Sequence, residues 1–175
     1  MAAESKQMNV VVFDTETTGL SPFQGDRIIE IGAVKLIDYA EVDEFHSLID
    51  AGVPISPQAQ SVHGISRKML CGQPKPEEVF TSFFNFITNS TLVAHNASFD
   101  QRFLVAQFTS LNLPLPARFE CTLRLSRRYL QLSNYRLETV YRHLGGRIDT
   151  SIQRHRALDD AKMAAFVWVE LNNRG

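Results

Sequence analysis

The sequence predicts an α/β fold in which a mixed sheet is flanked by helices. Three short runs of β-branched and aliphatic residues come first, and they predict an antiparallel meander. A fourth apolar run follows, and beyond it the apolar residues recur mostly at helical spacing. Three strands followed by strands that alternate with helices are typical of a mixed sheet.

The expected strands are short and bounded by turn residues. Asn9–Phe13 (NVVVF) is too short for a helix and predicts a buried strand. After the turn Gly19–Gly25, the runs Ile28–Ile37 and Glu44–Ile49 complete the meander. Thr91–Ala94 predicts a further buried strand, which leads directly into a helix.

The expected helices alternate with these strands and then dominate the second half. Pro57, at a position that suits the first turn, opens a short helix that ends near His63 and Gly64. Apolar side chains at helical spacing predict an amphipathic helix over Pro76–Thr88. The remaining helices are expected after Ala94, with Phe99, Phe103, Ala106 and Leu113 near one face, over Thr122–Leu130, over Leu137–Leu144 before Gly145-Gly146, and over Ala157–Asn172.

The length and composition of the chain are typical of a folded globular protein. The 175 residues suit one domain, so we expect a flexible leader over residues 1–8 and a single domain over residues 9–175. With 44% hydrophobic and 21% charged residues, wholesale disorder is excluded. The sequence has no apolar stretch of the ~18 residues that a membrane span needs. It also has no secretory signal and only two cysteines, which together predict a cytoplasmic protein.

Two acidic residues close the first expected strand. Residues two apart on a strand project to the same face, so Asp14 and Glu16 are expected to lie together beside the core. Hard cations such as Mg²⁺ and Mn²⁺ prefer such oxygen ligands. The alternative is a solvated strand edge, and the Asp-x-Glu pattern alone leaves both interpretations open.

A third acidic residue follows the fourth strand. If Asn96 caps the next helix, Asp100 lies in its first turn, where a carboxylate also suits the helix dipole. That structural role is one interpretation. The other is convergence with Asp14 and Glu16, because ligands gather at the carboxyl ends of strands in α/β sheets.

The last chemically informative segment opens the final helix. A helix that begins near Ala157 carries Asp160 toward the sheet, and the small Ala161 allows close approach. His155 then lies on the preceding loop, above the same site. The neighbouring Asp159 is expected to point elsewhere.

Four carboxylates and one histidine suit phosphodiester hydrolysis with two metal ions. Two divalent cations clamp the scissile phosphate, activate the attacking water and stabilise the leaving oxygen. A histidine, whose ordinary pKa is about 6.5, accepts a proton from that water at neutral pH. The neighbouring Arg156 is interpreted as a solvated side chain, with a phosphate contact as the alternative.

Three segments resemble the motifs of a known family. VFDTETTG (Val12–Gly19), AHNASFD (Ala94–Asp100) and HRALDDA (His155–Ala161) are similar to the three motifs of the DnaQ-like, DEDDh 3′–5′ exonucleases. The best-known members are the proofreading epsilon subunits of bacterial DNA polymerase III. The resemblance spans about Asn9 to Val169. It implies an RNase H-like fold, with three antiparallel strands followed by parallel ones.

The resemblance also implies roles for individual residues. The residues that match the ligands of two divalent cations, Mg²⁺ or Mn²⁺, are Asp14, Glu16, Asp100 and Asp160, and the one that matches the general base is His155. The related DEDDy branch has a tyrosine where this chain has Arg156, so the histidine branch is favoured. Positions that match contacts to the 3′-terminal nucleotide are Thr17, Leu20, His63, Asn96 and Phe99.

Structural alternatives accompany several of these positions. His63 at a helix end before a glycine, Asn96 as a helix cap and Phe99 as a core residue each have a purely structural explanation. Glu30 also fits the family pattern, and it is interpreted as a structural residue or as one that supports the ligands.

We therefore expect a metal-dependent exonuclease that releases nucleoside monophosphates from the 3′ end of DNA, with single strands preferred. The alternatives are an exoribonuclease of the same family, a binding module without catalysis, and a phosphatase. A DNA polymerase is a possible partner, although the chain ends at residue 175 without the tail that polymerase-linked members often carry. A proofreading subunit and a stand-alone exonuclease both stay open.

The net charge of −1 hides an uneven distribution. Residues 118–156 hold nine arginines against three acidic residues, whereas the rest of the chain is acidic. These arginines are interpreted as solvated helix faces, some of which form a rim that guides phosphates toward His155. Because two divalent cations offset the four ligand carboxylates, the balanced charge does not argue against a nucleic-acid substrate.

Overall fold

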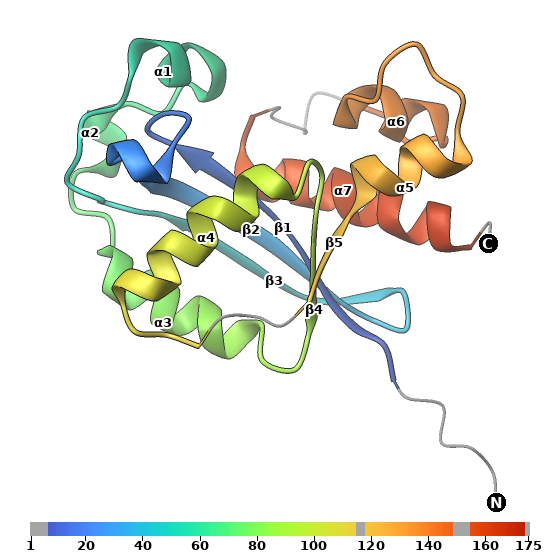
Figure 1. Cartoon of the computed structure of the whole chain (residues 1–175), viewed down its shortest axis with the longest axis horizontal. Coiled ribbons are helices and arrows are strands. Elements are labelled where there is room, and N and C mark those ends of the chain that lie inside the picture. The colour runs from blue at the N-terminus through green and yellow to red at the C-terminus, as the bar shows by residue number, and fades with distance from the viewer. Residues whose placement is uncertain (1–6, 115–117, 149–154, 174–175) are drawn as a thin grey trace, which may run out of the picture.

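The computed structural model describes residues 7–114, 118–148 and 155–173, which are built around a five-stranded sheet (Figure 1). The strands are β1 (Asn9–Thr17), β2 (Ile28–Ile37), β3 (Ala40–Leu48), β4 (Thr91–Ala94) and β5 (Phe119–Cys121), arranged in the order β3-β2-β1-β4-β5. β1, β2 and β3 are antiparallel neighbours, whereas β4 and β5 run parallel to β1. The expected mixed sheet is confirmed.

Helices connect and cover these strands. Those described are α1 (Pro57–His63), α2 (Arg67–Leu70), α3 (Pro76–Phe86), α4 (Ser98–Ser110), α5 (Thr122–Tyr129), α6 (Leu137–His143) and α7 (Ala157–Asn172), with a 3-10 turn η1 at Pro22–Gln24. α1 begins at Pro57 and ends where Gly64 adopts a left-handed backbone with φ of 70°, as its sequence predicts. Among the described residues, no helix has the length and apolar composition needed to cross a bilayer.

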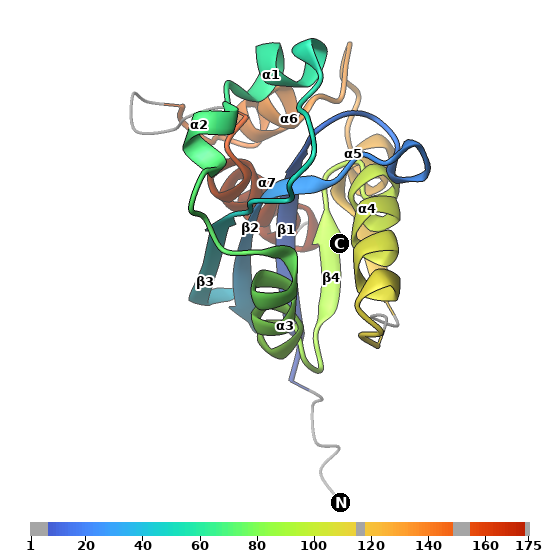
Figure 2. The ribbon, with the colours of Figure 1, turned by 90° about the vertical axis from the view of Figure 1, so that its left-hand side faces the viewer.

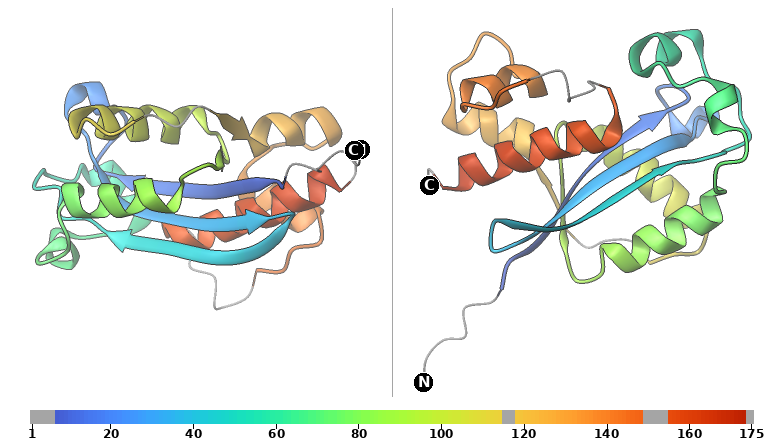
Figure 3. Two further views of the ribbon diagram at one scale, coloured as in Figure 1. Left: turned by 90° about the horizontal axis from the view of Figure 1, so that it is seen from below. Right: turned by 180° about the vertical axis from the view of Figure 1, so that it is seen from behind.

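Helices cover both faces of the sheet (Figures 2 and 3). α3 and α4 cover one face, where Phe83 and the β1 residue Phe13 belong to one buried cluster. α7 covers the other face, where Trp168 and the β1 residue Val12 belong to a second buried cluster. Since side chains alternate along a strand, the even-numbered residues of β1 face α7.

Several observed elements differ from the predicted ones. β5 and α2, with three and four residues, are absent from the prediction because such short segments have no measurable periodicity. β1 extends to Thr17, beyond the apolar run Asn9–Phe13 that predicts it, and β3 begins at Ala40 rather than Glu44. Both extensions are rich in polar residues, and a hydrophobic pattern therefore misses them.

Candidate functional site

The acidic end of β1 lies against the first turn of α7. Asp14 and Glu16 are even-numbered residues of β1, on the face that α7 covers. Their partners on β2 are Gly32, opposite Asp14, and Glu30, opposite Glu16. A Cβ atom at position 32 would meet the backbone of Leu158, so glycine is needed for α7 to begin this close to the sheet.

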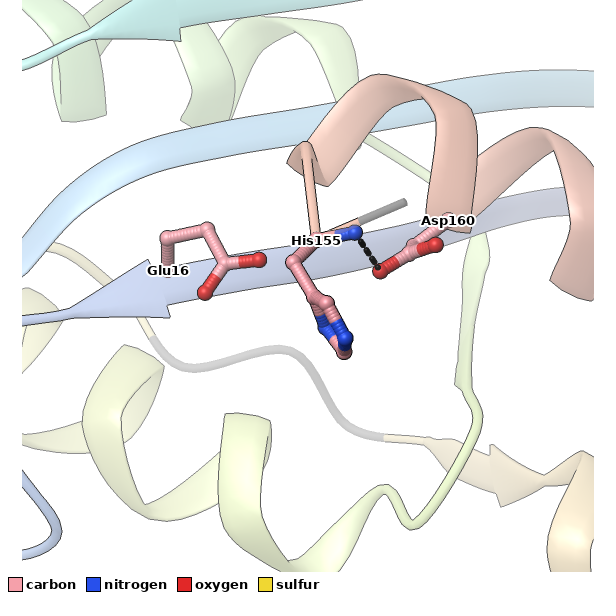
Figure 4. A group of neighbouring side chains, drawn as sticks. All are labelled: Glu16, His155 and Asp160. Atoms are coloured by element: carbon pink, nitrogen blue, oxygen red, sulfur yellow. Dashed lines mark hydrogen bonds between the residues drawn. The ribbon is translucent and has the colours of Figure 1, made fainter. Parts of the chain in front are cut away.

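The close approach of α7 brings His155 and Asp160 to Glu16 (Figure 4). One ligand atom from each of these three side chains lies within 4.8 Å of the other two. The backbone N–H of His155 donates to Asp160 Oδ2 at 3.2 Å, and His155 is exposed. The structure therefore places His155 on the turn before α7, beside two of the predicted ligands.

Asp100 reaches the same region from α4. It lies in the first turn of this helix, soon after β4, and is 3% exposed. Thr15 holds Asp100 through two hydrogen bonds to Oδ1, from its backbone N–H at 3.1 Å and from Oγ1 at 2.7 Å. Because β1 and β4 are parallel neighbours, their carboxyl ends meet at one edge of the sheet and bring these residues together.

Burial and mutual repulsion raise the pKa of these carboxyl groups. Burial, followed by the nearby charges of Asp100 and Asp160, raises the pKa of Asp14 well above its ordinary value. Burial and then the charges of neighbouring acids, Asp160 first, raise the pKa of Glu16 to about 9. Burial also raises the pKa of Asp100 to about 7, against the opposing hydrogen bonds from Thr15. In the absence of a cation, Glu16 therefore holds a proton near neutral pH and Asp100 is partly protonated.

A divalent cation fits this donor set. Carboxylate oxygens are the ligands that Mg²⁺ and Mn²⁺ prefer, and a bound cation reverses the repulsion that raises the pKa values. The carboxylates that converge here from β1, α4 and α7 are Asp14, Glu16, Asp100 and Asp160. The residues present thus suit hard divalent cations.

The residues predicted to contact substrate differ in accessibility. Leu20, on the turn after β1, is 79% exposed. His63 is buried, accepts the Ile65 N–H at Nδ1 and donates from Nε2 to the Thr17 carbonyl at 3.2 Å. Thr17 is buried as well, and its Oγ1 donates to the Gly19 carbonyl at 2.6 Å. Burial lowers the pKa of His63, so this ring is neutral and both of its nitrogens have partners within the chain.

Asn96 and Phe99 precede Asp100 at the start of α4. The prediction that Asn96 caps this helix is wrong, because the helix begins after Ala97 and Asn96 has a left-handed backbone with φ of 62°. Its backbone carbonyl accepts the Phe99 N–H at 3.0 Å, and the residue is exposed. Phe99 is half-buried, with its ring centroid 5.1 Å from that of Phe103. Phe99 thus contributes to the core, whereas Asn96 is accessible.

Arg156 pairs with Glu30, a contact that the sequence does not predict. Arg156 is not the solvated residue that the sequence suggests, because its Nη2 donates to Glu30 Oε1 at 2.7 Å. The signal in the sequence is an acidic residue within an otherwise apolar strand, since a buried carboxylate requires a partner. The sequence does not show which of the 18 lysines and arginines is that partner.

Comparison with known proteins assigns this fold to a family. The profile of the RNase_T family, described as "Exonuclease", matches residues 11–167. The chain belongs to this exonuclease family. The DNA polymerase III subunit epsilon of Rickettsia conorii is 36% identical over 168 residues, which cover 92% of this chain and 72% of that protein. The PolC-type DNA polymerase III of Thermotoga petrophila is 43% identical over 162 residues, and the match covers 91% of this chain but 11% of that protein.

Solved structures of exonucleases share the fold. Exonuclease X, solved in complex with 5′ overhanging duplex DNA, is 31% identical with a TM-score of 0.76, over 95% of this chain and 92% of that one. The nuclease domain of 3′hExo, a DEDDh family member bound to rAMP, is 20% identical with a TM-score of 0.80, over 99% of this chain and 96% of that one. The RNase H-like fold and the membership in the DnaQ-like DEDDh exonucleases are confirmed.

Proposed function

We propose that this exonuclease domain hydrolyses the terminal phosphodiester bond at the 3′ end of a DNA strand and releases nucleoside monophosphates. The observation that carries the proposal is the convergence of four acids and one histidine, namely Asp14, Glu16, Asp100, Asp160 and His155. Carboxyl groups this close together oppose one another's ionisation, and bound cations offset the repulsion between the ionised groups. The family of the chain and the epsilon subunits among its relatives support the same reaction.

The four acids are the proposed ligands of two divalent cations, Mg²⁺ or Mn²⁺. When bound, such cations polarise the scissile phosphate and lower the pKa of a coordinated water. Contacts within the chain hold the carboxylates in position before any cation binds. Thr15 orients Asp100 with two hydrogen bonds, and the glycine at position 32 lets α7 bring Asp160 to the sheet.

His155 is the proposed general base. Its exposed imidazole stands beside Glu16 and Asp160, where it accepts a proton as a water oxygen forms its new bond to phosphorus. The bond between phosphorus and the 3′ oxygen of the shortened strand then breaks, and this oxygen takes a proton from solvent. The hydrogen bond from the His155 backbone to Asp160 ties the base to a proposed ligand.

A single DNA strand is the proposed substrate, and an RNA strand is the alternative. Leu20 and Phe23, 79% and 84% exposed, present apolar surface on the turn after β1, where a nucleobase can stack. The arginines of α5, which begins at the carboxyl end of β5, are Arg124, Arg127 and Arg128, and they offer charge to the phosphates. Exonuclease X, solved with DNA, supports DNA as the substrate class.

A DNA polymerase is the proposed partner of this domain, and the cytoplasm is its proposed location. Relatives of the chain include both epsilon subunits and PolC-type polymerases of DNA polymerase III. If the domain acts together with a polymerase, its proposed role is proofreading of the newly made strand. If it acts without one, its proposed role is trimming of DNA 3′ ends.

The test is degradation of 5′-labelled single-stranded DNA and RNA oligomers in Mg²⁺, Mn²⁺ or EDTA. A descending ladder that requires metal, is faster on DNA and slows more than about 100-fold in Asp160→Asn supports the proposal. Asp159→Asn is the matched control, because it removes the same charge from the same turn of α7 and is expected to retain activity. Intact DNA under every metal condition contradicts the proposal, and a faster RNA ladder favours the exoribonuclease.

A further inference from the structure

A fifth acidic residue, Glu30, lies beside the proposed ligands but is bound differently. Its side chain is fully buried on β2, opposite Glu16 in the strand pair. Arg156 donates to Glu30 Oε1 from Nε at 3.0 Å and from Nη2 at 2.7 Å. His46 Nε2 lies 2.7 Å from the same oxygen, and the Ala157 N–H donates to Oε2 at 3.3 Å. Both carboxylate oxygens are therefore hydrogen-bonded within the chain.

These contacts distinguish Glu30 from the proposed metal ligands. Burial by itself would raise the pKa of Glu30, but hydrogen bonds from His46 and Arg156 outweigh burial and lower it. Across the strand pair, the pKa of Glu16 is raised to about 9. Glu30 is thus an ionised carboxylate whose charge is matched by a guanidinium, and its oxygens are occupied by the start of α7.

The partners of Glu30 belong to the segment that carries the proposed base. Arg156 directly follows His155, and Ala157 is the first residue of α7, three residues before Asp160. His155 has a left-handed backbone with φ of 58°, a conformation that surrounding contacts must maintain in a residue other than glycine. Glu30 therefore accepts hydrogen bonds from Arg156, the residue after the proposed base, and from the backbone N–H of Ala157, the first residue of α7.

We propose that Glu30 and Arg156 are positioning residues that fix His155 and Asp160 over the acidic end of β1. The inference rests on the proposed function, in which His155 is the base and Asp160 is a ligand. Gly32 permits α7 to approach the sheet, and the ion pair of Glu30 with Arg156 determines where its first turn is held. Arg156 thereby serves the reaction without contacting the phosphate.

Arg156→Met and Glu30→Gln test this role through kcat and KM. Each variant removes the ion pair while retaining much of the side-chain volume. We expect kcat to fall about 10- to 100-fold, the range found for groups that orient ligands, with little change in KM for the DNA oligomer. Lys162→Met and Glu44→Gln are the matched controls, because they remove another α7–sheet ion pair, with N···O of 2.6 Å, and are expected to retain kcat. Wild-type kcat in Arg156→Met overturns the proposal.

A double substitution shows whether Arg156 acts through His155. In a His155→Ala background, the base that Arg156 positions is absent and only its effect on Asp160 remains, so Arg156→Met is expected to cost less in kcat than in the wild-type chain. A smaller loss in this background supports the proposal. An equal loss in both backgrounds overturns the positioning of His155, because Arg156 would then act independently of the base.

Hydrogen exchange gives a readout that needs no nuclease activity. The N–H groups of residues 157–160 are expected to exchange faster in Glu30→Gln than in the wild-type protein, while those of α3 stay unchanged. If Glu30→Gln does not fold, Arg156→Met is measured in its place. Unchanged exchange over residues 157–160 overturns the proposal. Wild-type protein without nuclease activity refutes the proposed function instead, and faster exchange in the variant then still supports the positioning role.

Discussion

His155 combines a strained backbone with an accessible imidazole. Its φ of 58° lies in the left-handed region, which costs a residue other than glycine roughly 1–2 kcal/mol. Its N–H bond to Asp160 Oδ2 helps to hold the turn. Strained residues of this kind are typical of functional sites, where the surrounding structure maintains a geometry that the isolated residue disfavours.

His155→Ala is expected to lower kcat about 10²- to 10⁴-fold while Mn²⁺ affinity is retained, because a general base transfers a proton and the carboxylates hold the cations. Single-turnover degradation of labelled DNA gives the rate, and titration calorimetry with Mn²⁺ gives the affinity. A His155 nitrogen lies within 4.8 Å of carboxylate oxygens of Glu16 and Asp160. A large loss of Mn²⁺ affinity in the variant would therefore identify His155 as a ligand rather than the base.

Small side chains on α7 lie nearest the site. Ala157, Ala161 and Ala164 are at most 1% exposed, and the backbone at the start of α7 lies against Gly32. Farther along the helix, the large Trp168 fills the space above the sheet. The position of the proposed base and ligand thus depends on how closely the first turn of α7 meets β2.

Gly32→Ala is expected to displace this first turn. The added Cβ would meet helix backbone rather than a flexible side chain, so we expect a loss of about 1–3 kcal/mol in the free energy of unfolding. In a chain of this length, that loss corresponds to a fall in Tm of about 2–12 °C. We also expect kcat to fall at temperatures where the variant is folded, since Asp160 moves with the helix. Thermal unfolding and the DNA ladder check both parts, and a wild-type Tm with wild-type kcat would refute the packing argument.

Local sequence predicts elements only where a pattern extends over enough residues. α3 and α7 have several turns of apolar periodicity, and the sequence places both. β5 has three residues, and its pairing of Phe119 with Leu92 joins segments that are distant in the chain. Its existence therefore depends on tertiary contacts, which local hydrophobicity does not encode.

At the scale of the whole molecule, the acidic site couples stability to pH and to cations. The pKa of Glu16 is near 4.5 in an unfolded chain and about 9 in the folded protein, and the pKa of Asp100 is raised to about 7 by folding. Between the unfolded and folded pKa values, the folded state therefore binds more protons than the unfolded state. In the absence of cations, the contribution of these groups to the free energy of unfolding is therefore fully present below about pH 4 and is lost as the pH rises toward 9.

We accordingly expect the Tm in EDTA to fall between about pH 5 and pH 9, and saturating Mg²⁺ to weaken or reverse this trend, because bound cations favour the ionised carboxylates. Thermal unfolding across this range, with and without Mg²⁺, checks the expectation. Glu16→Gln with Asp100→Asn is the control, since these changes should flatten the slope measured in EDTA. Parallel slopes in EDTA and Mg²⁺ would contradict the coupling.

The chemical character of the site could be predicted from the sequence, but its supporting contacts could not. Acidic residues that follow apolar strands already indicate ligands at a sheet edge, and three motifs add the family. The contacts that orient them join distant segments: Thr15 with Asp100, 85 residues apart, and Glu30 with Arg156, 126 residues apart. Such partners are selected by three-dimensional packing, and no local pattern identifies them.

Trp168 is the only tryptophan of the chain, and it lies in the buried cluster between α7 and the sheet, on the same helix as Asp160. Its fluorescence therefore reports the docking of the helix that completes the site. Because α7 packs on strands that lie far from it in the sequence, we expect its docking to follow the formation of the helix itself. During refolding, stopped-flow fluorescence of Trp168 then measures the rate at which α7 docks. Recovery of Mn²⁺ binding measures the rate at which the carboxylates assemble, so the two steps can be observed separately.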